Sequence, residues 1–171
     1  MKIIKLKEMV NLPNILTIAN ASSGLISIYF AINSMLAYAA ICILIAACFD
    51  YLDGTAARML KISNPSGKEL DSLADLISFG IAPAMIGYMM NSSLAACVIY
   101  MLYVLSGLIR LARFNVMGIK DYFIGTPIPL GAVVIALLTL IPQFPVYLML
   151  YIFMIFSITM LLPIKIKKMR L

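Results

Sequence analysis

The sequence predicts an all-α, polytopic membrane protein with six transmembrane helices and a short N-terminal helix at the membrane interface. Of its 171 residues, 64% are hydrophobic, and the mean hydropathy of +1.06 is far above that of soluble domains. Three uncharged stretches are each long enough for about two spans of roughly 20 residues, and each has a polar or proline-containing break near its middle. These stretches are Met9–Phe49, Leu76–Ile109 and Tyr122–Ile164, with breaks at Asn33-Ser34, Asn91–Ser93 and Pro142–Pro145. We therefore expect three helical hairpins in a single domain over residues 1–171.

The basic residues predict how these hairpins are oriented. All 13 Lys and Arg residues lie in four segments, at 2–7, 58–68, 110–120 and 165–170, and none lies at a hairpin tip. Because cytoplasmic loops are enriched in Lys and Arg, both termini of this multi-pass cell-membrane protein are expected in the cytoplasm. Met1–Leu12 mixes Lys with Ile and Leu, which suits a helix lying at the interface. The net charge of +6 is thus explained by topology, and no nucleic-acid partner is expected.

The lengths of the hairpins place charges inside the bilayer. Leu76–Ile109 is too short for two spans of about 20 residues and a tip, so its helices must extend over Asp71 and Asp75 at one end and Arg110 at the other. The second span must likewise run on through Asp50 and Asp53. Burying one such charge costs about 2.5–3.5 kcal/mol on insertion scales, and intramembrane charges therefore usually mark function. The alternative is that carboxylates near helix ends reach toward water.

The spacing of the aspartates favours a metal site. Asp50 and Asp53 are three residues apart, and Asp71 and Asp75 are four apart, so each pair shares one helix face. Two pairs on consecutive helices can face each other, and two divalent cations would neutralise their charge. Carboxylate oxygens favour Mg²⁺ or Mn²⁺, and Ca²⁺ also fits. The chain has no His, which excludes His-ligated zinc and His-based catalysis. A divalent-cation transporter remains an alternative, because intramembrane carboxylates also line ion pathways.

A longer pattern contains these aspartates. It reads Asp50-Tyr-Leu-Asp53-Gly54-Thr-Ala-Ala57-Arg58, followed by Gly67, Asp71 and Asp75 at fixed spacing, and it resembles the signature of the CDP-alcohol phosphatidyltransferase family. The resemblance implies a six-helix fold, a homodimer, and a polar cavity open to the cytoplasm. It also implies that the four aspartates hold two metal ions, which bind the diphosphate of a CDP-activated lipid. Asp75 would in addition be the general base for an acceptor hydroxyl, with release of CMP.

The same resemblance implies the residues that bind the donor. Gly54, Ala57 and Arg58 would contact the cytidine or the diphosphate, and Gly67 belongs to the same motif. Polar residues at the start of the first span and in the following loop are expected to complete the nucleotide pocket. These are Asn14, Thr17 and Asn64.

Two further segments resemble the phosphatidylserine synthase branch of the family. They are Arg110-Leu-Ala-Arg113-Phe114-Asn115 and the stretch from Phe123 to Pro129. Arginine binds carboxylates through a two-point fork, so Arg110 and Arg113, aided by Asn115, are expected to bind L-serine as the acceptor. Two alternatives remain: the arginines could anchor the cytoplasmic end of the span, or the acceptor could be glycerol phosphate or inositol phosphate.

Overall fold

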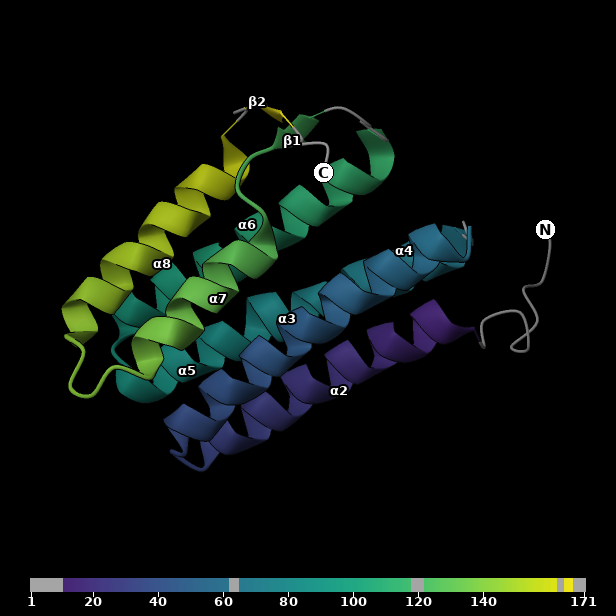
Figure 1. Cartoon of the computed structure of the whole chain (residues 1–171). Helices are drawn as coiled ribbons and strands as arrows, with labels where there is room; N and C mark the ends of the chain where they lie inside the picture. Colours follow the sequence, from purple (N-terminus) through teal and green to yellow (C-terminus); the bar gives the residue numbers. More distant parts are fainter. Residues whose placement is uncertain (1–10, 62–64, 118–121, 163–164, 168–171) are drawn as a thin grey trace.

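The computed structural model describes residues 11–61, 65–117, 122–162 and 165–167, and these residues form a helical bundle (Figure 1). The expected interfacial helix at the N-terminus and the predicted site residue Asn64 lie outside the described residues. The elements are, in chain order, α2 (Leu12–Ile32), α3 (Leu36–Met59), α4 (Pro65–Asp75), the π-helix η1 (Leu76–Ile81), α5 (Ala82–Met90), α6 (Leu94–Met117), β1 (Tyr122–Ile124), α7 (Ile128–Thr139), α8 (Val146–Leu161) and β2 (Lys165–Lys167).

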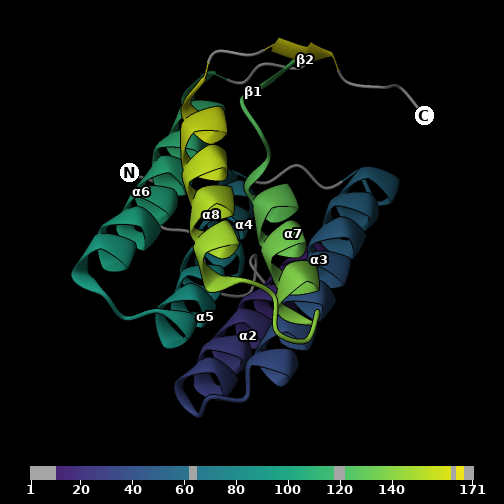
Figure 2. The same cartoon turned by 90° about the vertical axis from the view of Figure 1, so that its left-hand side faces the viewer.

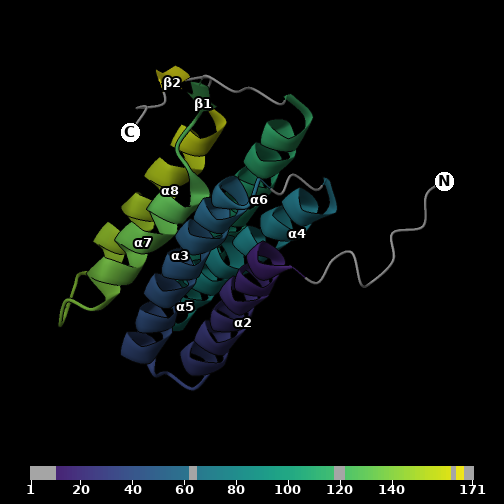
Figure 3. The same cartoon turned by 45° about the vertical axis from the view of Figure 1, so that its right-hand side comes forward.

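The three predicted hairpin tips are confirmed. The chain leaves the helical conformation at residues 33–35, 91–93 and 140–145, where the sequence has its polar and proline-containing breaks. Ser34 and Gln143 adopt positive φ angles of 60° and 58°, which reverse the chain at two of the tips. All three tips lie at one end of the bundle, at the lower left of Figure 1. Figures 2 and 3 show the same arrangement, with the ends of α3, α6 and α8 and the start of α4 at the opposite end.

In the part of the chain that the structure describes, four helical stretches are long and apolar enough to cross a membrane: α2, α3, the continuous run Pro65–Met90, and α6. The helices α7 and α8 are apolar but shorter, with 12 and 16 residues. The chain is therefore a polytopic membrane protein by the length and composition of its helices. The helix extents inferred from hairpin length are confirmed, because α3 runs beyond Asp53, α4 contains Asp71 and Asp75, and α6 continues past Arg110.

One element departs from the predicted all-α fold. β1 and β2 pair antiparallel over three residues each, with Tyr122 opposite Lys167. The α7–α8 hairpin brings the chain before α7 and the chain after α8 to the same end of the bundle, where their backbone groups can pair (Figure 2). This pair could not be predicted from the sequence, because three residues are too few for an alternating hydrophobic pattern to indicate a strand.

The π-helix η1 follows Asp75 directly and has a local cause. In a regular α-helix the carbonyl of Phe79 would accept a hydrogen bond from the residue four positions on, which is Pro83 and has no N–H. The hydroxyl of Tyr103 on α6 donates to this carbonyl instead, at 2.9 Å. Tyr103 is fully buried and packs edge-on against Phe153 of α8. The contacts of Tyr103 with η1 and Phe153 therefore hold in place the π-helix that directly follows Asp75.

Candidate functional site

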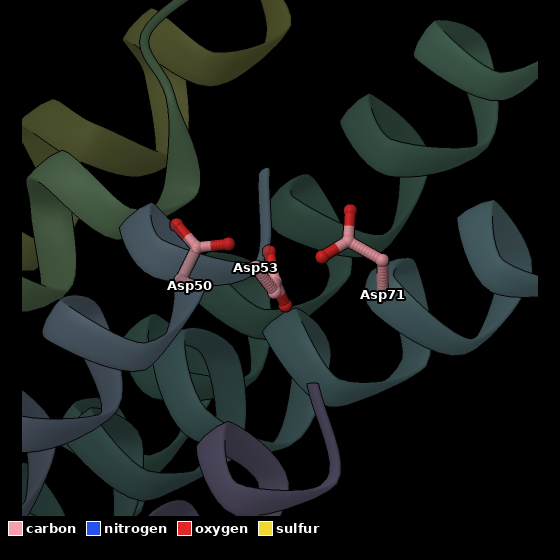
Figure 4. Close-up of side chains that lie close together, drawn as sticks. All are labelled: Asp50, Asp53 and Asp71. Carbon is pink, nitrogen blue, oxygen red and sulfur yellow. The ribbon is translucent and has the colours of Figure 1, made fainter. Parts of the chain in front are cut away.

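Three carboxylates from two helices meet near the end of the bundle opposite the hairpin tips. Asp50 and Asp53 lie one turn apart on α3, and Asp71 lies on α4. One carboxylate oxygen of each residue lies within 4.8 Å of the other two. Figure 4 shows Asp53 between Asp50 and Asp71. The structure thus brings together three of the four predicted metal ligands.

This group fits a divalent cation. Two oxygens on opposite sides of an Mg²⁺ ion, each about 2.1 Å from it, are about 4.2 Å apart, so separations of this size need only small side-chain adjustments. The Oδ1 atom of Asp71 is buried and has no hydrogen-bond partner among the described residues. A buried carboxylate oxygen is costly unless it is paired, and a metal ion would pair it. Asp50, Asp53 and Asp71 are therefore the residues that could hold such an ion.

Asp75 lies beside this group but is not part of it. Its side chain is buried, with 7% of the residue exposed. The Nδ2 atom of Asn20 on α2 donates a hydrogen bond to Asp75 Oδ1 at 3.3 Å. Asp75 also interacts with the side chain of Asp50 on α3 and, electrostatically, with Arg110 on α6. The structure thus places Asp75 in contact with Asp50, one of the three carboxylates that could bind a metal, and within electrostatic reach of Arg110.

Helix α2 contributes polar residues to the site. Thr17 donates from Oγ1 to Asp53 Oδ2 at 2.7 Å and is also close to the carbonyl of Pro13, at 3.1 Å. The sequence analysis placed Thr17 in the nucleotide pocket and did not predict the contact with Asp53. It missed Asn20 altogether, although the signal was present: Asn14, Thr17 and Asn20 follow a spacing of three, which gives an apolar helix one polar face. All three residues are buried.

The predicted donor-binding residues of α3 lie at its C-terminal end, past Asp53. An added Cβ atom at Gly54 would meet only the Nη1 atom of Arg58, at 4.0 Å, so the space above this glycine is open. Ala57 is half-buried, and Arg58 is exposed and donates to the hydroxyl of Thr55 at 3.1 Å. Gly67 lies half-buried in the first turn of α4. A ligand could therefore reach the backbone of α3 next to the carboxylate group.

The three predicted acceptor residues have different surroundings. Arg110 is buried beside Asp75, with 8% of the residue exposed, and its Nε atom has no hydrogen-bond partner among the described residues. Arg113 instead donates from Nη1 to the carbonyl of Leu161 at the end of α8, at 3.2 Å. Asn115 donates from Nδ2 to the hydroxyl of Ser72 on α4, at 3.0 Å. The structure therefore brings Arg110 to the carboxylates, whereas Arg113 and Asn115 join helices to one another.

Together these side chains provide three chemical capabilities at one place. The group of three carboxylates can hold a cation, and a cation can bind phosphate oxygens. Asp75 can take a proton from a hydroxyl that lies within hydrogen-bond reach of it. Arg110 can bind an anionic group, because its guanidinium is buried and has an unpaired donor. Such a set suits phosphoryl transfer to an alcohol that also carries a negative charge.

Comparisons with known proteins place the chain in a family. Archaetidylserine synthase of Methanothermobacter thermautotrophicus is 42% identical over 137 residues, covering 77% of this chain and 59% of the relative. CDP-diacylglycerol–serine O-phosphatidyltransferases are 40% identical in Mycobacterium leprae and 37% identical in Helicobacter pylori. These alignments cover 78% and 75% of this chain and 48% and 57% of the relatives. The chain thus spans roughly half the length of the curated relatives that it matches. The family model for CDP-alcohol phosphatidyltransferases matches residues 10–162, which contain every described site residue, and the chain belongs to this family.

Proposed function

We propose that the protein transfers a phosphatidyl or archaetidyl group from a CDP-activated lipid to the hydroxyl of L-serine and releases CMP. The observation that carries this proposal is the placement of Asp75 and Arg110 next to the group formed by Asp50, Asp53 and Asp71. The printed names of the relatives in Methanothermobacter, Mycobacterium and Helicobacter support serine as the acceptor. The reaction would be a step of phospholipid biosynthesis.

The residues of the site have separate roles in this proposal. Asp50, Asp53 and Asp71 hold the divalent cations, Mg²⁺ or Mn²⁺, and Asp75 is the fourth carboxylate available to a second ion. When bound, these ions supply charge neutralisation for the diphosphate of the donor. The open backbone at Gly54, with Ala57, Arg58 and Gly67 around it, accommodates the nucleotide. Asn14 and the undescribed Asn64 complete the pocket.

Asp75 and Arg110 act on the acceptor. Asp75 takes the proton of the serine hydroxyl as its oxygen attacks the lipid-side phosphorus of the donor. A new phosphorus–oxygen bond forms to serine, the bond to the bridging oxygen of the diphosphate breaks, and CMP leaves with that oxygen. Arg110 binds the serine carboxylate, and its position beside Asp75 brings the hydroxyl of the same molecule to the base. The chain has no His, and direct displacement needs no covalent intermediate.

The proposal includes an arrangement in the membrane. All six helical stretches cross the bilayer, the site lies at the cytoplasmic end, and both termini are cytoplasmic. By helix rise, α7 and α8 span about 18 and 24 Å, less than a hydrocarbon core of about 30 Å. Flanking residues and local thinning of the bilayer make up such a difference at modest cost. A homodimer of this single domain is the expected assembly.

The experiment that tests the function is CMP release by purified protein. CDP-diacylglycerol and CDP-archaeol are each supplied with Mg²⁺ or Mn²⁺ and a panel of acceptors: L-serine, ethanolamine, glycerol phosphate and inositol phosphate. Serine should give the fastest release with at least one donor. Faster release with a phosphate-bearing acceptor would refute serine as the acceptor, and no release with any acceptor would refute the transferase.

A further inference from the structure

Helix α2 places two hydrogen-bond donors against aspartates of two other helices. Thr17 donates to Asp53 on α3, and Asn20 donates to Asp75 at the end of α4. Thr17 and Asn20 are three residues apart and therefore lie on the same face of α2. Helix α2 thus contacts Asp53, one of the three possible metal ligands, and also Asp75, which lies outside that group.

Close to these two hydrogen bonds, contacts with η1 fix the position of α2 in the bundle. The hydroxyl of Ser78 in η1 donates to the backbone carbonyl of Asn20 at 3.0 Å. One turn further along α2, Gly24 packs so closely on Ser78 that an added Cβ atom would lie 2.7 Å from the Ser78 Cα atom. The π-helix and α2 are therefore held in one relative position. This packing sets where the Asn20 amide meets Asp75.

The amide of Asn20 is only half satisfied. Its residue is fully buried, and its Oδ1 atom has no hydrogen-bond partner among the described residues. A buried polar atom without a partner lowers stability, so a side chain that served only the fold would be better replaced by leucine of similar size. The feature that leucine could not supply is the donor to Asp75.

We propose that Thr17 and Asn20, which both lie on α2, are positioning residues. Thr17 orients Asp53, a possible metal ligand, and Asn20 orients Asp75, the proposed base. A carboxylate has two oxygens, and a donor on one oxygen fixes the direction of the other. Thr17 binds Asp53 Oδ2 and would thereby orient Asp53 within the metal group, whereas Asn20 binds Asp75 Oδ1 and would leave Asp75 Oδ2 for the acceptor hydroxyl. The assignment of Asp75 as the base rests on the proposed function.

The two residues should therefore have different signatures when they are replaced. Partners that orient metal ligands are typically worth about 10- to 100-fold in metal affinity or activity. Thr17→Val, which keeps the shape and removes the hydroxyl, should weaken Mn²⁺ binding by about 10-fold or more, and Thr17→Ser should restore it. Asn20→Leu should lower kcat by about 10- to 100-fold, with Mn²⁺ affinity within about 2-fold of the wild type. It removes one unpaired buried atom, Asn20 Oδ1, and leaves another, Asp75 Oδ1, so the unfolding temperature should stay within a few degrees of the wild type.

The measurements are Mn²⁺ titrations of the purified protein with and without CDP, serine-dependent CMP release, and thermal unfolding in detergent followed by a thiol-reactive dye on the three native cysteines. Ser22→Ala is the matched control, because the Ser22 hydroxyl lies on the exposed face of α2 and, among the described residues, donates only to the carbonyl of Ile18 in the same helix. This control should leave all three readouts unchanged.

Several results would overturn the inference. If the wild type binds no Mn²⁺, or if Thr17→Val raises the KM for the CDP-lipid while Mn²⁺ affinity stays constant, Thr17 does not position a metal ligand. If Asn20→Leu lowers the unfolding temperature and kcat to the same degree as Thr17→Val, both residues serve only the fold. Absence of CMP release by the wild type would refute the proposed function instead, and the Mn²⁺ titrations would still decide the role of Thr17.

Discussion

Arg110 and Arg113 provide a direct test of acceptor binding. The sequence places them three residues apart, and hairpin length draws Arg110 into the bundle, but the sequence leaves open whether one or both bind the acceptor. In the structure Arg110 is buried within electrostatic reach of Asp75, and its Nε atom has no hydrogen-bond partner among the described residues. Arg113 instead donates a hydrogen bond to the carbonyl of Leu161, the last residue of α8. We predict that Arg110→Ala impairs serine binding, and that Arg113→Ala leaves serine binding intact and loosens the end of α8.

The size of each effect follows from the bond that is lost. A hydrogen bond to a charged group contributes about 1.5–3 kcal/mol, so Arg110→Ala should raise the KM for serine by about 10- to 150-fold. Arg113 is half-buried, and the bond that it makes to a helix-end carbonyl contributes about 1 kcal/mol to stability. Arg113→Ala should therefore lower the unfolding temperature by a few degrees. Its KM for serine should stay within about 2-fold of the wild type, because no contact with the carboxylates is removed.

The assay is initial-rate CMP release, with serine varied at saturating CDP-lipid and then CDP-lipid varied at saturating serine. Ethanolamine provides a second control, since it has the hydroxyl and the amine but no carboxylate. Arg110→Ala should reduce the preference for serine over ethanolamine by the same factor by which it raises the serine KM. Equal increases in the KM values for serine and CDP-lipid would refute the assignment, and so would a serine KM that rises as much in Arg113→Ala.

Three further predictions concern the metal, the base and the membrane arrangement. Asp71→Asn should abolish CMP release and weaken CDP-lipid binding. Chelation should inhibit the wild type until Mg²⁺ or Mn²⁺ is restored. Full activity after exhaustive chelation would refute a metal site. Asp75→Asn should largely retain CDP-lipid binding and lose turnover by about 10²- to 10⁴-fold, with metal content measured alongside because Asp75 is also available to a second ion; near-normal turnover would remove Asp75 from the role of base. In a variant without native cysteines, a cysteine at Gln143 should be labelled from outside the cell and one at Lys61 should not, and the reverse pattern would invert the proposed topology.

Much of the helical layout could be predicted from the length of apolar segments alone. The stretch between Leu76 and Ile109 is too short for two spans, and this deficit requires helices that continue over charged residues at both ends. The structure has these extensions in α4 and α6, and α3 likewise carries Asp50 and Asp53. Helices continue over these charged residues because a helix in lipid must satisfy its backbone hydrogen bonds over the whole thickness of the bilayer, whatever side chains it carries.

Which aspartates form the compact group, and which arginine lies near them, depends on contacts between helices and could not be predicted from the sequence. The spacing of the four aspartates places each pair on one helix face and does not distinguish Asp75 from the others. In the structure Asn20 of α2 donates to Asp75, and Asp50, Asp53 and Asp71 form the compact group. Likewise, the i, i+3 rule puts Arg110 and Arg113 on one face, but the end of α8 occupies Arg113. Local spacing shows which residues can meet, and only the packing of other helices shows which of them do.

The distribution of unpaired polar atoms indicates why such a site is stable enough to exist. Among the described residues, four buried side-chain atoms have no hydrogen-bond partner, and three of them surround one place: Asn20 Oδ1, Asp71 Oδ1 and Arg110 Nε. Each such atom costs about 1–3 kcal/mol, a large share of the roughly 5–15 kcal/mol by which folded domains are stable. A fold under selection for stability alone would have removed them. Their concentration beside the carboxylates supports the proposed function, in which a cation would pair Asp71 Oδ1 and an anionic acceptor would pair Arg110 Nε.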